Sequence, residues 1–412
     1  MKKLIWIFLP FVLAACEGIG PKKTKYISEL TPKLTVESEE PIIVSSELKA
    51  NVFATDLTKQ KTYILTKNRI IAPPAFAKGV LYFIDDKGKV TAFSKKEKKP
   101  LWTQEISHTT HDHNHLGGGI VYSNEKLYVT NGSRFLIILD SNTGYEIMRK
   151  EFPDIIRIKP VLLTDNVVII QTVSNQMFAY DIAASKFVWQ HEGMFETLTS
   201  SLYVKPILHD SNVLVNYSSG QIFSFNTKNW QEEWALNLSQ SGDISLPSFE
   251  AVILSSQPIV EADYIYLPSS TGKILKVALQ SGEIVWEAKA SDVMSMTLNG
   301  NNLFITNNAK QVAAISTSTG KVKWVGSLEV IKEKQKSKAL ALLAPVISKT
   351  EQGFAVSVIA GNGEIYNFFS LDDKTLPLQA TQIKGLKNTQ FMGATCCGDT
   401  YLINDKNIMF VE

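Results

Sequence analysis

The stretch that decides the fold is residues 258–286, which read PIVEADYIYLPSSTGKILKVALQSGEIVW. It contains two short apolar strands, Tyr264–Leu267 and Ile274–Val277, separated by a polar turn with Gly272, and it ends at Trp286. Short strands joined by glycine-containing polar turns are typical of antiparallel sheets. A single unit of this size cannot bury its own apolar faces, so it requires neighbours of the same kind.

The same unit recurs along most of the chain. In three copies a glycine follows a leading proline by 14 residues and a tryptophan follows it by 28; these copies begin at Pro74, Pro206 and Pro258. A fourth copy begins at Pro160 and ends at Trp189. It has Asn175 near the glycine position, where asparagine tolerates a positive φ angle better than most residues.

Three less regular copies complete the series. They cover about residues 118–148, residues 303–324 and the stretch that begins at Pro345. A period of roughly 40 to 50 residues predicts an all-β fold, namely a single eight-bladed β-propeller of four-stranded antiparallel blades. We expect the eighth blade to combine the C-terminal strands, 400–403 and 408–411, with an early strand at Ile42–Val44 or Val52–Phe53. Such closure hides the sheet edges.

The glycine and tryptophan positions have separate physical reasons. Glycine in the Thr-Gly and Ser-Gly turns supplies a positive φ angle. Tryptophan at the end of each outer strand can fill the wedge between neighbouring blades, where it buries a large area with few rotamers. The combined pattern resembles the repeat of pyrroloquinoline-quinone (PQQ)-like propellers.

The bulk composition limits the classes of partner. Of 412 residues, 44% are hydrophobic and 20% charged, which is an ordinary globular balance. The 42 basic and 40 acidic side chains give a net charge of +2. This balance argues against a surface that neutralises phosphates, and therefore against nucleic acid as a partner.

The N-terminus carries a processing signal. Lys2 and Lys3 precede an apolar run, Leu4–Leu13, and residues 13–16 read LAAC, which matches the lipobox of bacterial lipoproteins. We therefore expect residues 1–15 to be a lipoprotein signal peptide and Cys16 to be the lipid attachment site, which carries acyl chains such as palmitate. Residues 16–40 then form a flexible tether and residues 41–412 the propeller. Glu17 favours the outer membrane, on its periplasmic face, over retention at the inner membrane.

One segment narrows the class of propeller. Residues 116–122 read LGGGIVY and residues 126–132 read KLYVTNG. Together with the lipobox and the repeat, they resemble the outer-membrane protein assembly factor BamB family, in its alphaproteobacterial form, over about residues 40–412. The resemblance implies a non-catalytic scaffold of the β-barrel assembly machinery without a cofactor. It implies binding to the POTRA domains of the barrel-inserting subunit BamA, and contact with unfolded barrel precursors.

The resemblance also indicates where such a partner binds. The family's contacts lie in connections between blades, which correspond by repeat register to residues 197–205 and 251–257. Members of the family have a Leu-Arg pair in the first connection and two aspartates in the second. This chain has Ser200, Ser201, Ile253 and Ser255 at those positions. Only the location can therefore be carried over, and the alternative is that both are ordinary surface loops.

PQQ-like repeats also build quinoprotein dehydrogenases, which are the enzyme alternative. Such an enzyme needs Ca²⁺ with several oxygen ligands and an aspartate base over the quinone. No such group stands out here, so we expect no catalytic residue. Cys396–Cys397 could form a strained vicinal disulfide, but we favour two small, part-buried thiols in the final blade. A propeller that binds another envelope partner is a further alternative.

Two further tracts are rich in histidine or in lysine. His108, His111, His113 and His115 are candidate Zn²⁺ or Cu²⁺ ligands. Their polar neighbours and the following glycines indicate a loop between blades, which seldom offers the supporting contacts of a preorganised site, so we expect no functional metal site. The alternating lysines in residues 332–338 are interpreted as a solvated loop, with a lipid-headgroup or acidic-partner contact as the alternative.

Overall fold

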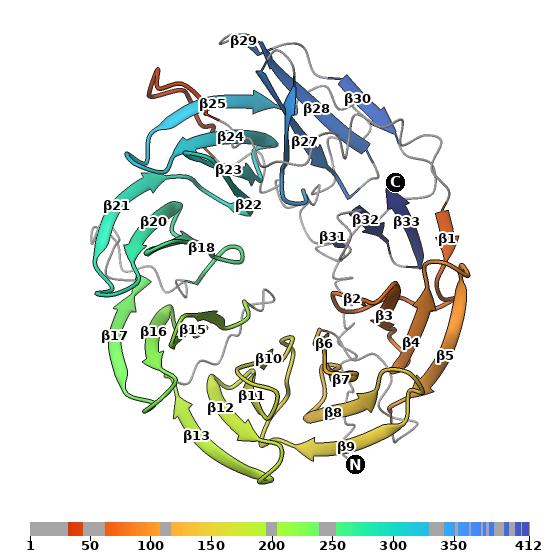
Figure 1. Cartoon of the computed structure of the whole chain (residues 1–412). Coiled ribbons are helices and arrows are strands. Elements are labelled where there is room, and N and C mark those ends of the chain that lie inside the picture. Colours follow the sequence, from red (N-terminus) through yellow and green to blue (C-terminus); the bar gives the residue numbers. More distant parts are fainter. Residues whose placement is uncertain are drawn as a thin grey trace, which may run out of the picture.

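The computed structural model describes residues 32–43, 62–107, 117–194, 204–238, 253–328 and, with short gaps, 342–411. The regular elements of this part of the chain are strands, which form eight antiparallel sheets arranged in a ring (Figure 1). This arrangement confirms the predicted eight-bladed β-propeller. None of the described residues forms a helix with the length and hydropathy that crossing a bilayer would require.

The sheets are numbered here as blades 1 to 8. Blade 1 contains β2 (Ala75–Ala77), β3 (Val80–Ile84), β4 (Lys89–Ser94) and β5 (Lys99–Glu105). Blade 2 contains β6 (Gly119–Ser123), β7 (Lys126–Thr130), β8 (Phe135–Asp140) and β9 (Glu146–Glu151). Blade 3 contains β10 (Val161–Leu162), β11 (Val167–Gln171), β12 (Gln176–Asp181) and β13 (Lys186–Glu192). Blade 4 contains β14 (Ile207–His209), β15 (Asn212–Asn216), β16 (Gln221–Asn226) and β17 (Glu232–Asn237).

The second half of the ring follows the same plan. Blade 5 contains β18 (Ile259–Glu261), β19 (Tyr264–Ser269), β20 (Lys273–Ala278) and β21 (Ile284–Lys289). Blade 6 contains β22 (Val293–Asn299), β23 (Asn302–Asn307), β24 (Gln311–Ser316) and β25 (Val322–Ser327). Blade 7 contains β26 (Val346–Thr350), β27 (Gly353–Ile359), β28 (Glu364–Leu371) and β29 (Lys374–Thr375), and β30 (Gln379–Gln382) also pairs with β28. Blade 8 contains β31 (Phe391–Ala394), β32 (Thr400–Ile403), β33 (Asn407–Val411) and β1 (Thr62–Ile64).

The ring closes in blade 8, as expected, by pairing an early strand with the C-terminal strands. The early strand is β1, whose Thr62 lies opposite Met409 of β33. The predicted choices for this strand were wrong or untested. Ile43 lies elsewhere, beside Asn301 of blade 6, and residues 52–53 lie outside the described residues. β1 was not predicted because its sequence, TYI, is short and has an exposed side chain at both ends.

The core is divided among the interfaces between neighbouring blades. Between blades 4 and 5, for example, Leu214, Ile222 and Trp234 pack with Leu267 and Val277. Comparable clusters of buried residues lie between blades 8 and 1, 1 and 2, 2 and 3, 3 and 4, 5 and 6, and 6 and 7. A chain of this length therefore folds with many small cores in series, since one core seldom grows past about 250–300 residues.

The tryptophans lock successive blades together, as predicted. The indole N–H of Trp234 donates a hydrogen bond of 2.6 Å to the carbonyl oxygen of Leu279 in blade 5. The Trp234 ring lies on Gly282, where a Cβ atom would come within 2.8 Å of it. Gly282 has a φ angle of 74°, so this position needs glycine for both space and backbone conformation.

The same contact recurs at two other interfaces. The indole N–H of Trp102 donates to Ser141 O at 3.0 Å, and that of Trp286 donates to Thr317 O at 3.1 Å. Their rings lie on Gly144 and Gly320, respectively. Between blades 3 and 4, Trp230 replaces the glycine, has a φ angle of 59° and stacks on Trp189 with 4.7 Å between ring centroids.

The turns between the second and third strands use the predicted residues. Gly88, Gly220 and Gly272 have φ angles of 70°, 79° and 83°. Asn175 takes the equivalent place in blade 3 with a φ angle of 59°, as predicted. Its side chain also accepts a hydrogen bond from the backbone N–H of Ser218 in blade 4.

Residues 32–43, which we call the N-terminal strap, lie along the outer edge of blade 6 (red beside β25 in Figure 1). The backbone N–H groups of Glu37 and Ser38 donate to Val322 O in β25. At one end of the strap Leu34 is held by the side chain of Gln311, and at the other Glu40 accepts a hydrogen bond from Ser316. The strap thus attaches the last part of the predicted tether to the propeller, and residues 16–31 lie outside the described residues.

Candidate functional site

The candidate site lies at the end of the propeller where the chain passes from one blade to the next. We call this end the connection rim and define it by residues 157–160, 204–206 and 253–258. Each of these segments leads directly into the inner strand of a blade, β10, β14 or β18. The two predicted partner-binding connections, 197–205 and 251–257, therefore reach the same rim.

The structure places two of the four predicted partner-binding residues. Ile253 and Ser255 flank the buried Leu254, which forms an isolated antiparallel bridge with Ser269 of blade 5. The backbone N–H of Ser255 donates to Pro268 O at 2.8 Å, and Ser270 N–H donates to Ile253 O at 2.8 Å. The backbone of both residues thus extends the inner edge of blade 5, and their contact with a partner stays a prediction. Ser200 and Ser201 lie outside the described residues.

The two predicted connections contact one another. The backbone N–H of Lys205 donates to the side-chain oxygen of Gln257 at 3.2 Å. The amide group of Gln257 donates in return to Lys205 O at 3.4 Å. Gln257 thereby fixes the backbone of Lys205 just before the inner strand of blade 4.

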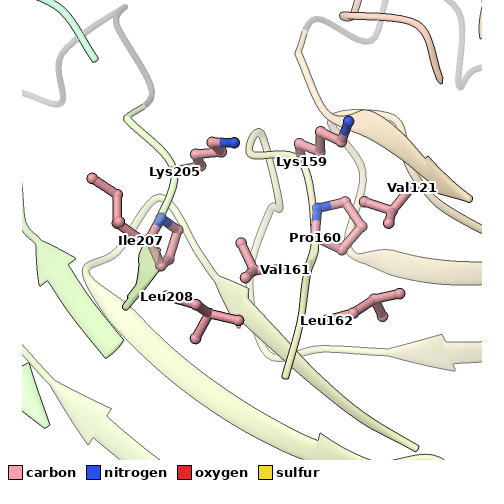
Figure 2. Close-up of a pocket in the computed structure, with 9 residues that line it drawn as sticks. Val121, Lys159, Pro160, Val161, Leu162, Lys205, Ile207 and Leu208 are labelled. Carbon is pink, nitrogen blue, oxygen red and sulfur yellow. The ribbon is translucent and has the colours of Figure 1, made fainter. Parts of the chain in front are cut away.

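Lys205 belongs to a pocket that the sequence did not predict. The pocket has a volume of 370 Å³ and lies between the inner strands of blades 3 and 4, with one wall from blade 2. Seven of its nine lining residues are apolar: Val121, Pro160, Val161, Leu162, Pro206, Ile207 and Leu208. The other two are Lys159 and Lys205, which lie together at one end, while Leu162 and Leu208 lie at the opposite end (Figure 2).

The electrostatics of this pocket, which we call the Lys159–Lys205 pocket, are unbalanced. None of its nine lining residues is acidic. Burial, followed by the nearby Lys205 ammonium group, lowers the pKa of Lys159 from its ordinary value to about 8. Two cations beside apolar walls attract an anionic group, which would restore the balance of charge.

Lys159 is positioned by blade 2 as well as by its own blade. The residue before it, Ile158, forms a parallel bridge with Gly118, and its carbonyl oxygen accepts a hydrogen bond of 2.8 Å from the Thr130 hydroxyl. Gly119 lies against the Lys159 stem so closely that a Cβ atom there would be 2.7 Å from Lys159 Cβ. The glycines of the LGGGIVY segment therefore serve the close approach of two inner strands.

A sequence signal for the pocket exists, but it is weak. Lys-Pro precedes the inner strand in two consecutive blades, at residues 159–160 and 205–206. The apolar walls, by contrast, come from three consecutive blades and become neighbours only when these blades pack together. A repeated dipeptide alone therefore could not identify this pocket.

The remaining sequence-predicted candidates are not placed. Cys16, the cysteine pair 396–397, the lysine-rich stretch 332–338 and the four histidines His108, His111, His113 and His115 all lie outside the described residues. Among the residues that are described, no three histidine, cysteine or acidic side chains come together as a metal site.

The ring of four-stranded blades, its closure by β1 and its Trp-Gly contacts define a β-propeller of the PQQ-like repeat class. The sequence profile of a family described as "Outer membrane protein assembly factor BamB" matches residues 86–325. The chain belongs to this BamB-like propeller family.

Relatives and solved structures agree with this assignment. An uncharacterized protein of Rickettsia conorii is 38% identical over 411 residues, which is 99% of both chains. The outer membrane protein assembly factor BamB of Shewanella oneidensis is 21% identical over 262 residues, covering 62% of this chain and 66% of that protein. The crystal structure of BamB from Moraxella catarrhalis has the same fold, with a TM-score of 0.67 at 16% identity, and covers 85% of this chain and 98% of that one.

Proposed function

We propose that this protein is a non-catalytic scaffold lipoprotein of the outer-membrane β-barrel assembly machinery. It is anchored through Cys16 to the periplasmic face of the outer membrane and binds the POTRA domains of a BamA-like barrel protein. In this role it helps to bring unfolded barrel precursors to the site of insertion.

The observation that carries this proposal is the match of the BamB family over residues 86–325, which runs from β4 of blade 1 to β25 of blade 6. Blades locked by Trp-Gly contacts suit a rigid scaffold, because their rims hold connections in fixed places. The connection rim supports a binding role further, since the predicted partner-binding connections meet there at Lys205 and Gln257.

The direct test is co-purification from native envelope in mild detergent with a tag at the C-terminus. The expected result is recovery of a large barrel protein with POTRA domains, in an amount comparable to that of the tagged protein. Repeated absence of such a protein, with a different envelope protein recovered in its place, contradicts the proposal.

The anchor has its own test. A Cys16→Ala variant should leave the membrane fraction and keep the far-ultraviolet circular dichroism of a folded propeller. Lipid labelling with a radioactive fatty acid should be lost at the same time. A variant that stays lipidated and membrane-bound contradicts the anchor assignment, and one that unfolds contradicts the boundary at residue 40.

A further inference from the structure

We infer that the Lys159–Lys205 pocket is a docking site for a protein segment that presents a carboxylate between apolar side chains. The inference deepens the proposed function and rests on it only in taking the occupant to be a protein. It assigns a chemical complement to the connection rim, where the predicted partner-binding residues Ile253 and Ser255 carry no charge.

The shape of the pocket fits a few side chains of a segment. Its volume of 370 Å³ is at the small end of the roughly 300–1,000 Å³ that ligand pockets span. Val161 and Ile207, from β10 and β14, belong to two different inner strands, so the cleft runs between blades. Burying apolar side chains against such walls contributes about 25 cal/mol per Å² of area removed from water.

The two lysines of the pocket favour an occupant with a negatively charged group. Within the described part of the chain, no carboxylate lies at salt-bridge distance from the ammonium group of Lys159 or Lys205. The lowered pKa of Lys159 shows that its charged form is disfavoured in the free protein. A bound carboxylate would stabilise that charge, and charge-assisted hydrogen bonds are about twice as strong as neutral ones.

The pocket is preorganised for this occupant. Gln257 holds the backbone of Lys205 through two hydrogen bonds, and blade 2 holds the residue before Lys159. The two prolines, Pro160 and Pro206, fix the backbone φ angle directly after each lysine. Less conformational freedom is therefore lost when a ligand binds.

The apolar walls favour a protein segment over a free anion or a lipid headgroup. Inorganic phosphate would use the two ammonium groups and leave the leucines at the far end of the pocket empty. A membrane lipid would need its headgroup to reach between the innermost strands of the ring. A short extended segment can place one carboxylate at the lysines and its flanking side chains against the walls.

The test uses the mature full-length protein in detergent and two end-blocked, rhodamine-labelled peptides, GSLDLSG and GSLNLSG. Fluorescence anisotropy measures their dissociation constants for the wild-type protein, for a Lys159→Gln/Lys205→Gln double variant and for Lys126→Gln. Lys126 lies in β7 with an exposed side chain, so its variant controls for a loss of surface charge. Circular dichroism confirms that each variant is folded.

The wild-type protein should bind the aspartate peptide at least tenfold more tightly than the asparagine peptide, because hydrogen bonds to a charged group are stronger than those between neutral groups. The double variant should lose this discrimination, and Lys126→Gln should keep it. Equal binding of both peptides by the wild type, or discrimination that survives in the double variant, overturns the inference.

Competition between the peptides and phosphate-containing ligands tests whether the pocket instead binds a free anion or a lipid headgroup. If inorganic phosphate, or vesicles that contain phosphatidylglycerol, occupy the lysines and neither peptide competes with them, the pocket binds phosphate groups and the inference is wrong. Acetylation of Lys159 by an amine reagent, followed by mass spectrometry, gives a second readout, and the aspartate peptide should protect it at least fivefold. If the peptides fail while the co-purification succeeds, the pocket assignment falls and the assembly role stands.

Discussion

The outer wedges between blades and the inner Lys159–Lys205 pocket are built from the same repeat but treat polar groups in opposite ways. In the wedges, the indole N–H groups of Trp102, Trp234 and Trp286 each have a carbonyl acceptor in the next blade. In the pocket, two ammonium groups lie beside apolar walls that include no acidic residue. The wedges thus satisfy their polar groups and stabilise the ring, whereas the proposed docking pocket holds two lysines and no acidic lining residue.

The largest expected effect in this comparison comes from removing a wedge tryptophan. Trp234→Ala should lower the free energy of unfolding by about 3–5 kcal/mol, because it leaves a cavity and deprives Leu279 O of its hydrogen bond. Urea unfolding followed by circular dichroism measures the loss. Val285→Ala, on the exposed face of β21, should change it by less than about 0.5 kcal/mol. A loss below about 1 kcal/mol for Trp234→Ala would contradict the wedge role.

A second substitution separates backbone strain from wedge packing. Gly79 and Gly282 have φ angles of 77° and 74°, but a Cβ atom at Gly79 meets nothing within 4 Å, whereas one at Gly282 meets the Trp234 ring. Gly79→Ala should therefore cost about 1–2 kcal/mol of stability, and Gly282→Ala about 1–3 kcal/mol more. Equal losses in the same urea assay would show that the ring contact is unimportant.

The smallest expected effect is a pH dependence from the pocket. Because the pKa of Lys159 is about 8 in the folded protein and 10.5 ordinarily, the unfolded chain binds more protons between these values. The free energy of unfolding should therefore rise with pH across that window. Below pH 8 the cost of burying the charged Lys159 side chain is fully present. We expect this rise in the free energy of unfolding to be about 1–2 kcal/mol, since partial exposure of Lys159 screens its charge.

Unfolding free energies measured from pH 7 to pH 10 check this prediction. The rise should be reduced in Lys159→Gln by comparison with both the wild type and Lys126→Gln. Identical pH profiles for the wild type and Lys159→Gln would mean that the pocket does not disfavour the lysine charge.

Most of the fold could be predicted from the sequence because its determinants are local and repeated. The glycine of each turn and the tryptophan of each outer strand act within one repeat and its neighbour, as Gly282 and Trp234 do. The closing strand β1 was missed because three residues with a weak apolar pattern gain their place only by pairing with β33. The pocket was missed because its walls belong to three consecutive blades and meet only when these blades pack together.

The most direct test of the account is a calorimetric titration of the mature lipoprotein, in detergent, with the purified POTRA domains of the barrel-inserting protein from the same bacterium. We predict saturable binding to the wild type, at least tenfold weaker binding to the Lys159→Gln/Lys205→Gln variant, and unchanged binding to Lys126→Gln. Equal affinity of the wild type and the double variant would contradict the connection rim as the binding surface. If none of the three proteins showed saturable binding, that result would contradict the assembly role itself.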